Sequence, residues 1–394
     1  MPKYTPRWRA VLWSLVFSVI VAEVTSAIGL KLIHRPLYWT ADEMPRRTEK
    51  DPWGAWGVPN SKSRLVGPCY NVEYNFNSVG ARDKERHIQS PKRWIVLGDS
   101  FVDGFGIEEN QRFTNILEER TGWEFANFGN SGDFGPLQYY LIYKDLAKQF
   151  EHDGVIVGLL LFNDFTDNDA EWWKLHQNRY QQNRYRPYAI LSEDNRSYKI
   201  IYGTSGNATP RADFNVPPPP DDDASALDEK RLSTIRALAR RLSEVSATFS
   251  LFRQLSSEFS SRSIIESFYN RLTPGYFTTD QREITAVKLI LHDLAGEIGN
   301  RPKIMLLFPV HSDFVARRSQ KKNYSDQVNQ FIGDLHSDGW RVIDMADALS
   351  EADQSTDLTL GCNAHWNATT NRRIADFLLA NYRKDLTELP ARSK

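Results

Sequence analysis

The chain has 394 residues, a formal net charge of −1 and a mean hydropathy of −0.52. Such a balanced charge gives no reason to expect nucleic acid as a partner, and the hydropathy excludes a polytopic membrane protein. Its length predicts two or three domains, or one domain with large additions. Two cysteines, Cys69 and Cys362, are too few for a disulfide scaffold or a four-cysteine zinc site.

The N-terminal segment contains an apolar run. Residues 10–30 carry a single charge, at Glu23, and their length matches the roughly 20 residues that cross a bilayer. Three basic residues precede the run: Lys3, Arg7 and Arg9. We interpret residues 1–35 as a cytoplasmic N-terminus and a transmembrane signal anchor, which places the rest of the chain in the periplasm or outside the cell. A signal peptide cleaved near residues 25–27 and a buried core helix are the alternatives.

Strand and helix patterns alternate through most of the remaining chain. Apolar runs predict strands in five segments: 93–100, which ends in a turn, 123–135, where a short strand runs into a Gly-rich loop, 154–164, 302–310 and 340–345. Helical spacing of apolar residues predicts four helices: 110–120, 136–150, 323–338 and 371–386. This alternation indicates a parallel sheet with helices on both faces.

The other segments fit around this sheet. Residues 36–90 are rich in Trp, Pro, Gly, Asn and charge, which is typical of an extended connecting segment with short strands. We assign residues 91–390 to a single α/β domain that is interrupted by an insertion over residues 165–300. Within the insertion we expect a hairpin at 186–203, a polyproline and acidic linker at 215–223, and helices thereafter.

Polar clusters follow the predicted strands. They are Gly98-Asp99-Ser100, the segment 129–133, Asn163-Asp164, and the segment 363–367 just before the last helix. Ligands of such sheets bind at the carboxyl ends of the strands, so we expect the four clusters to converge there.

The converging residues fit nucleophilic chemistry. A serine hydroxyl such as that of Ser100 needs a base, and His365 is the best candidate. An attacked carbonyl develops negative charge, which the backbone N–H groups of Ser100 and Gly132 and the side-chain amide of Asn163 would stabilise. Asp99 is predicted to support the turn through local hydrogen bonds. Asp164 is either a supporting residue or an ordinary loop acid.

Four sequence blocks together resemble the SGNH/GDSL hydrolase family. The blocks are LGDSFVDGFG (97–106), NFGNSGDFG (127–135), LLFNDF (160–165) and HWN (365–367). The segment NSVGARD (77–83) ahead of them also resembles exported members of this family. The resemblance implies an α/β/α sandwich with a flavodoxin-like sheet. It also implies Ser100 as nucleophile, His365 as base, and Ser100, Gly132 and Asn163 as oxyanion donors.

One position departs from the family pattern. The family normally has an Asp two or three residues before the histidine, whereas this chain has Cys362 and Asn363 there. Asn363 can orient the imidazole but cannot stabilise its positive charge, and an Asp-to-Asn change in the serine-protease triad lowers turnover by about 10⁴. The alternatives are a Ser–His dyad with a backbone carbonyl, a carboxylate from elsewhere such as Asp357, and a weak or inactive site.

These features predict a serine esterase that forms an acyl-Ser100 intermediate on an acyl ester, which we expect to be an extracytoplasmic carbohydrate ester or another small ester. The alternatives are an O-acyltransferase acting on a cell-surface polysaccharide and a non-catalytic polysaccharide-binding module. We expect no cofactor, no metal and no nucleic-acid partner, and contact with the membrane through the N-terminal helix. An exported location permits Cys69 to pair with Cys362, and two separate buried thiols remain equally open.

Overall fold

We describe the fold from a computed structural model of the chain. The structure describes residues 7–32, 37, 47–67, 69–90, 92–131, 134–169, 186–201, 238, 241–256, 275–278, 280–349, 358–360 and 364–388. The predicted linker at 215–223 and much of the insertion lie outside these residues.

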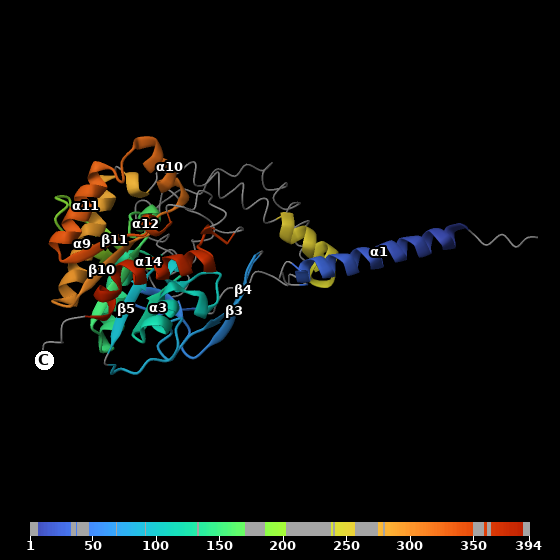
Figure 1. Cartoon of the computed structure of the whole chain (residues 1–394), viewed down its shortest axis with the longest axis horizontal. Helices are drawn as coiled ribbons and strands as arrows, with labels where there is room; N and C mark the ends of the chain where they lie inside the picture. Colours follow the sequence, from blue (N-terminus) through green and yellow to red (C-terminus); the bar gives the residue numbers. More distant parts are fainter. Residues whose placement is uncertain are drawn as a thin grey trace, which may run out of the picture.

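A parallel sheet of five strands forms the centre of the molecule (Figure 1). Its strands are β5 (Arg93–Gly98), β6 (Glu124–Gly129), β7 (Gly154–Leu159), β10 (Lys303–Leu307) and β11 (Trp340–Asp344). Their spatial order is β11-β10-β7-β5-β6, and all four neighbouring pairs are parallel. Every residue of β5 and β7 is buried, as expected for central strands that are covered on both faces. The predicted α/β class is therefore confirmed.

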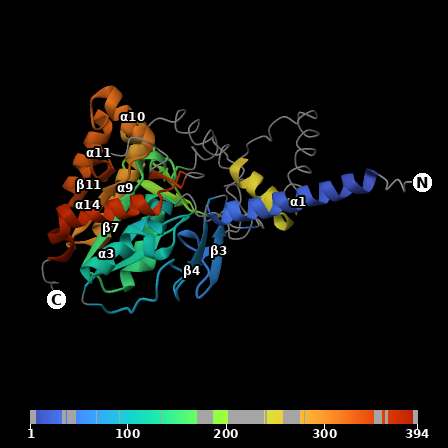
Figure 2. The same cartoon turned by 45° about the vertical axis from the view of Figure 1, so that its right-hand side comes forward.

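The helices divide into two layers because parallel crossovers are right-handed. The chain moves from β5 to β6 in one direction, then from β6 through β7 and β10 to β11 in the other. The first crossover and the later ones therefore place their helices on opposite faces. On one face α3 (Phe113–Thr121) packs against α14 (Ala368–Thr387). On the other face α9 (Gln281–Ile298) packs against both α4 (Pro136–Asp145) and α11 (Asp326–Ser337) (Figures 1 and 2).

Long-range contacts join the C-terminal helix to the first part of the sheet. The indole of Trp94 on β5 donates to the carbonyl of Leu386 at 2.9 Å, and the N–H of Phe113 donates to Asn371 Oδ1 at 3.1 Å. Both ends of α14 are thus fixed against the layer that begins with β5 and α3. This arrangement brings the segment just before α14 to the carboxyl end of β5.

Short hairpins precede the sheet, as the sequence predicts for residues 36–90. They are formed by β1 (Arg47–Asp51), β2 (Gly54–Gly57), β3 (Lys62–Val66) and β4 (Asn71–Asn75). Trp53 and Trp56 belong to the main hydrophobic core, while Leu65 and Tyr74 belong to a second, smaller core. The hairpin predicted at 186–203 is also present, as β8 (Tyr188–Leu191) and β9 (Tyr198–Ile201).

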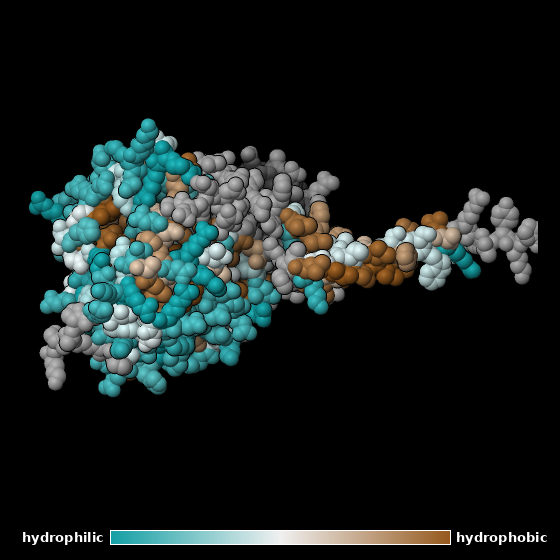
Figure 3. Space-filling model, in the orientation of Figure 1, coloured by the Kyte–Doolittle hydropathy of each residue, from teal (hydrophilic) through white to brown (hydrophobic). Residues whose placement is uncertain are grey.

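An apolar helix, α1 (Arg7–Leu32), extends away from the sheet (Figures 1 and 2). Residues 8–32 are long and apolar enough to cross a membrane, and no residue of their apolar 18-residue window is buried. Figure 3 shows its hydrophobic surface projecting from a mostly hydrophilic body. A signal sequence near an N-terminus has the same length and composition, so helix geometry does not separate the anchor from the cleaved signal peptide.

Two boundaries differ from the sequence prediction. The strand predicted at 154–164 ends at Leu159, and α5 (Leu161–Asp164) follows it directly. The Asp164 carboxylate accepts from the N–H of Leu160 at 2.7 Å, which turns the chain although the apolar run continues. The structure also contains helix α10 (His311–Gln320), which the sequence did not predict, and the short helix α12 (Ala346–Leu349).

Candidate active site

Ser100 lies at the carboxyl end of β5, on a sharp strand-to-helix turn. It is the first residue of α2 (Ser100–Asp103), so its N–H has no acceptor within that helix. Asp99 caps the helix, because its Oδ1 accepts from the N–H of Phe101 at 2.8 Å. Asp99 therefore supports the turn, as the sequence predicted, and Ser100 is left half-buried at the edge of the sheet.

The turn is pressed closely against the neighbouring strand. A Cβ added at Gly129, the last residue of β6, would lie 2.4 Å from the backbone nitrogen of Asp103. Only glycine permits this approach without moving α2. The same contact brings the end of β6, which leads into Asn130 and Ser131, next to the helix that begins at Ser100.

His365 reaches Ser100 from the far end of the sequence. Its Nε2 lies 2.6 Å from Ser100 Oγ. The histidine precedes α14 in a loop that pairs with residues 358–360, where the N–H of Leu360 donates to the carbonyl of His365 at 2.9 Å. Asn367 caps α14 by accepting from the N–H of Thr370 at 2.9 Å. The HWN block thus starts the last helix and fixes the loop that presents the imidazole.

Aromatic rings surround the imidazole of His365. Phe105 stacks on it with ring centroids 4.4 Å apart, and Phe101 lies at 5.1 Å. Trp366 packs on the far side of Phe101 and against Phe308. Burial in this apolar setting lowers the pKa of His365 to about 3, because an imidazolium would lose its hydration. The imidazole is therefore neutral at physiological pH, with the Ser100 hydroxyl within reach of its Nε2.

Asn163 follows the adjacent central strand, β7, and is held by a carboxylate that the sequence analysis missed. Its side-chain nitrogen donates to Asp167 Oδ2 at 2.7 Å. An amide nitrogen carries two hydrogens, so one remains for another acceptor. Asp167 is buried, one helical turn beyond Asn163. The four-residue spacing in NDFTD was the available signal for this pair.

Asp164 is completely buried and faces away from solvent. Its Oδ1 accepts from the hydroxyl of Tyr139 at 2.9 Å and its Oδ2 from the N–H of Leu160 at 2.7 Å. Burial, followed by the charges of Asp99 and Asp167, raises the pKa of Asp164 well above its usual range. Its contacts hold α5, and hence Asn163, against the end of β7.

A second buried network supports the loop that follows Ser100. Arg82, from the NSVGARD segment, donates to the carbonyls of Asp103 (2.9 Å), Gly104 (2.8 Å) and Ile107 (2.7 Å). Its guanidinium lies 3.7 Å from the ring centre of Tyr74, whose hydroxyl donates to Asp103 Oδ2 at 3.0 Å. Ser131 also donates its hydroxyl to Asp103. The segments around β4, α2 and the end of β6 are thereby fixed to one another.

The structure brings Ser100 and His365 together and places Asn163 in α5, just after the neighbouring strand β7. The order of the strands reverses between β5 and β7, which is where ligands bind in folds of this kind. Gly132, Asn363, Cys362 and Asp357 lie outside the described residues. Cys69 is disulfide-bonded. The described residues contain no group of three or more His, Cys, Asp and Glu side chains that could hold a metal.

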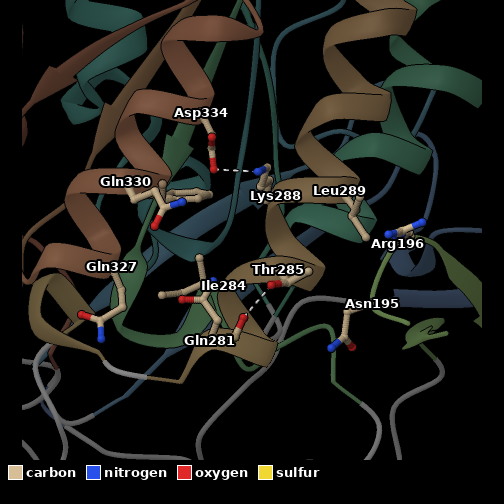
Figure 4. Close-up of a pocket in the computed structure, with 11 residues that line it drawn as sticks. Asn195, Arg196, Gln281, Ile284, Thr285, Lys288, Leu289, Gln327, Gln330 and Asp334 are labelled. Atoms are coloured by element: carbon tan, nitrogen blue, oxygen red, sulfur yellow. Dashed lines mark hydrogen bonds and ion pairs between the residues drawn. The ribbon is translucent and has the colours of Figure 1, made fainter. Parts of the chain in front are cut away.

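A separate hollow of about 310 Å³ lies between α9, α11 and the turn of the β8–β9 hairpin (Figure 4). Lys288 and Asp334 form an ion pair at 2.7 Å across it, and the hydroxyl of Thr285 donates to the carbonyl of Gln281. None of the described residues that the sequence predicts for the site lines this hollow. The chemistry of the molecule is therefore sought at Ser100.

Comparisons with known proteins add the following. No family model matches the chain, and neither does any curated protein. Solved structures that match include a member of the lipolytic G-D-S-L family from Veillonella parvula, with 12% identity, 74% of this chain and 99% of that chain covered, and a TM-score of 0.34. An alpha/beta hydrolase enzyme from the metagenome of Lake Arreo in Spain matches with 13% identity, 74% and 94% covered, and a TM-score of 0.32.

Proposed function

We propose that the protein is a serine ester hydrolase of the SGNH/GDSL type, with Ser100 as nucleophile and His365 as base. The observation that carries the proposal is the 2.6 Å contact between His365 Nε2 and Ser100 Oγ, which joins residues 265 positions apart at the carboxyl edge of the sheet. A nucleophile and a base within hydrogen-bond distance are the minimum that acyl transfer through serine requires.

The reaction proceeds in two halves. Ser100 Oγ attacks the ester carbonyl carbon while His365 Nε2 takes the hydroxyl proton, and the carbonyl oxygen becomes an oxyanion. The N–H of Ser100 and the second amide hydrogen of Asn163 stabilise that charge. When the tetrahedral intermediate collapses, the C–O bond to the alcohol breaks and His365 returns its proton to the leaving oxygen. Acyl-Ser100 remains.

Water then completes the cycle. His365 takes a proton from the attacking water, the second tetrahedral intermediate expels Ser100 Oγ, and the imidazole returns the proton to it. The products are a carboxylic acid and the free enzyme. A sugar hydroxyl in place of water would yield an acylated acceptor, so the hydrolase and the O-acyltransferase share the first half-reaction.

The substrate follows from the proposed location. A signal anchor at α1 places the site outside the cytoplasm, where acylated carbohydrates are exposed. We therefore propose an acyl ester of an extracytoplasmic carbohydrate as the substrate class. This part rests on the anchor and on the resemblance to exported SGNH proteins.

Turnover of a simple ester tests the proposal. Full-length protein in detergent is expected to hydrolyse p-nitrophenyl acetate, and the Ser100→Ala variant is expected to lose that activity. Ser337→Ala is the matched control, because Ser337 is exposed on α11 and donates only to the carbonyl of Gly333 in its own helix. Folded wild-type protein without activity above Ser100→Ala would support the non-catalytic binding module.

A second assay separates hydrolysis from transfer. The protein is incubated with an acyl ester donor in the presence and absence of an unacylated polysaccharide, and free acid and acylated polymer are measured by mass spectrometry. The hydrolase predicts the same yield of free acid in both. Acylated polymer that forms at the expense of free acid would instead favour the transferase.

A further inference from the structure

A second helix lies beside the apolar helix α1. Residues 247–256 lie across the C-terminal part of α1 in both views of the molecule (Figures 1 and 2). The link between them is Glu23, the single charge within residues 10–30. Its carboxylate accepts from the hydroxyl of Ser246 and, at 2.7 Å, from the N–H of Ala247.

This contact occupies the start of the second helix. Ser246 Oγ accepts from the N–H of Phe249 at 3.2 Å, so Ser246 caps its own helix while donating to Glu23. Glu23 in turn satisfies the N–H of Ala247. First-turn N–H groups have no partner within their helix, so a carboxylate is a favourable neighbour for them.

The buried face of this helix is small and polar. It consists of Ala247, Ser250 and Gln254, which are almost completely buried. Spacings of three and four residues place them on one side of the helix, and Ala247, which binds Glu23, is among them. The buried residues of α1, Ser26 and Leu30, follow Glu23 at helical spacing. Small and hydroxyl-bearing residues of this kind are typical of close helix contacts in membranes.

The opposite face of the same helix is apolar and exposed. Phe249 is 45% exposed, Phe252 71% and Leu255 52%. The exposed apolar side chains of α1 have comparable values, for example Phe17 at 68%. Figure 3 shows that hydrophobic surface extends over both helices. A helix with polar residues inside and large apolar residues outside has the reverse of the pattern expected in water.

The depth of Glu23 explains why a partner is needed there. If Arg9 marks the cytoplasmic boundary of the bilayer, Glu23 lies about 21 Å further along an ideal helix. The hydrocarbon core is about 30 Å thick, so the carboxylate falls inside the outer leaflet. A charged side chain at that position is costly unless hydrogen-bond donors accompany it into the membrane.

We propose that residues 247–256 form a second membrane-embedded element, which enters the outer leaflet beside α1 and exposes Phe249, Phe252 and Leu255 to lipid acyl chains. The bilayer is the environment that covers this apolar face, because the face is continuous with the apolar surface of α1. This inference rests on α1 spanning the membrane, but not on the esterase activity. It attaches the catalytic domain to the membrane at a second point, through the chain that connects β7 to β10, and limits the distance of the Ser100 site from the lipid surface.

Lipid exposure of single positions tests the inference. Full-length protein carrying Phe252→Cys is labelled with a nitroxide and reconstituted in phosphatidylcholine bilayers. Reference labels are placed at Phe17→Cys on α1 and at Lys322→Cys, an exposed polar position beyond α10. No described cysteine is free, and unlabelled wild type controls for background reaction. Collisions with oxygen, which concentrates in lipid, and with a water-soluble nickel chelate are measured by electron paramagnetic resonance.

The label at Phe252 is expected to collide more with oxygen than with nickel, as at Phe17, while Lys322 shows the reverse. A Phe252 label accessible to nickel would place the helix in water and overturn the inference. A label shielded from both reagents would overturn it too, because protein, such as a second copy, would then cover the face. If the label at Phe17 is itself accessible to nickel, α1 does not span the bilayer. That result would contradict the anchor and leave the proposed esterase activity untouched.

A pair of Glu23 variants tests the link between the helices. Glu23→Leu removes the acceptor for Ser246 and Ala247, and the label at Phe252 is expected to move from the lipid-like to the water-like ratio. Glu23→Gln keeps one acceptor oxygen and is expected to retain the lipid-like ratio. An unchanged ratio in Glu23→Leu would contradict the role given to Glu23.

Discussion

Asn163 and Asp167 have different proposed roles at the edge of the sheet. Asn163 would contact the developing oxyanion, whereas Asp167 holds its nitrogen at 2.7 Å and acts as a positioning residue. Their separation along one short segment means that orientation is set locally, before any substrate binds. Preorganised donors of this kind are effective because they need not reorient during the reaction.

Substitutions of Asn163 and of Asp167 are expected to lower kcat by different amounts. Asn163→Ala should lower kcat for ester hydrolysis by about 10²–10³, the usual cost of losing one oxyanion donor. Asp167→Ala should lower kcat by less, with KM little changed, because the donor is present but misoriented. Asp167→Asn can still accept through its side-chain oxygen and should restore much of the loss. Equal kcat in Asn163→Ala and wild type would remove Asn163 from the mechanism.

The pH dependence follows from the burial of His365. The imidazole must be neutral to accept the Ser100 proton, and burial lowers its pKa from 6.5 to about 3. The acid limb of kcat/KM is therefore expected near pH 3 rather than near pH 6.5. A limb close to pH 6.5 or above would indicate a carboxylate that stabilises the imidazolium.

The same pKa has a consequence for stability. The unfolded chain, with an ordinary histidine, binds a proton more readily than the folded protein does between about pH 6.5 and 3. The contribution of His365 to folding is complete above pH 6.5 and is lost as the pH falls through this window. Urea unfolding of wild type and of His365→Phe, measured at several pH values in this window, tests this. As the pH falls, the free energy of unfolding should decrease more steeply in wild type than in His365→Phe.

At the scale of single residues, the sequence predicted that Ser100 and His365 lie together, but not which residues hold their surroundings in place. Ser100 and His365 stand out by residue type and by their place after a strand and before a helix. Asp103 does not, because one carboxylate at the end of a short helix has no distinguishing pattern until its partners are known. For Asp167 the four-residue spacing from Asn163 was the available signal. Gly132 and Asn363 remain predictions, as they lie outside the described residues.

At the scale of elements, the segment before the sheet is part of the site's support. Arg82 joins the hairpin strand β4 to the turn after Ser100 through four backbone carbonyls and the ring of Tyr74. Arg82 is buried, and the carbonyls of Asp103 and Ile107 accept from its guanidinium in the interior.

Replacing Arg82 tests this role. Arg82→Met is expected to lower the free energy of unfolding by about 3 kcal/mol or more, because buried carbonyls lose their donor. Arg82→Lys keeps the positive charge but loses the planar guanidinium. Its free energy of unfolding should therefore lie between those of Arg82→Met and wild type. Urea unfolding of the detergent-solubilised protein measures both. A midpoint unchanged in Arg82→Met would mean that the hairpins and the sheet are held together by other contacts.

The elements themselves were largely predictable, since fully apolar runs such as 93–98 and 154–159 occur at the centre of parallel sheets. The exceptions have local causes. Leu160 and Leu161 extend an apolar run, yet Asp164 binds the N–H of Leu160 and starts a helix there. Helix α10 is rich in polar residues and has few apolar positions, so its pattern did not distinguish it from a loop.

At the scale of the whole molecule, the proposed location of the site depends on the N-terminal helix α1. The sequence predicted both its length and its apolar character, and α1 has both. It did not predict that Glu23 binds Ser246 and Ala247, because residues more than 200 positions apart meet only in the folded chain.

Retention of this helix distinguishes an anchor from a cleaved signal peptide. The mature protein is expected to keep its N-terminal segment and to stay in the membrane fraction after alkaline carbonate extraction, because about 20 apolar residues remain in the bilayer. Intact mass spectrometry of the purified protein shows whether the N-terminal segment is still present. A mature N-terminus just after Ala27 would establish cleavage instead.

The most direct test of the central claim is labelling by a fluorophosphonate, which reacts only with a serine activated by a base. Full-length protein in detergent is expected to take up one equivalent of probe, with the modified peptide containing Ser100. His365→Ala should slow labelling, Ser100→Ala should abolish it, and Ser337→Ala should leave it unchanged. Modification of a different residue, or a folded protein that stays unlabelled, would contradict the account of Ser100 and His365 as a reacting pair.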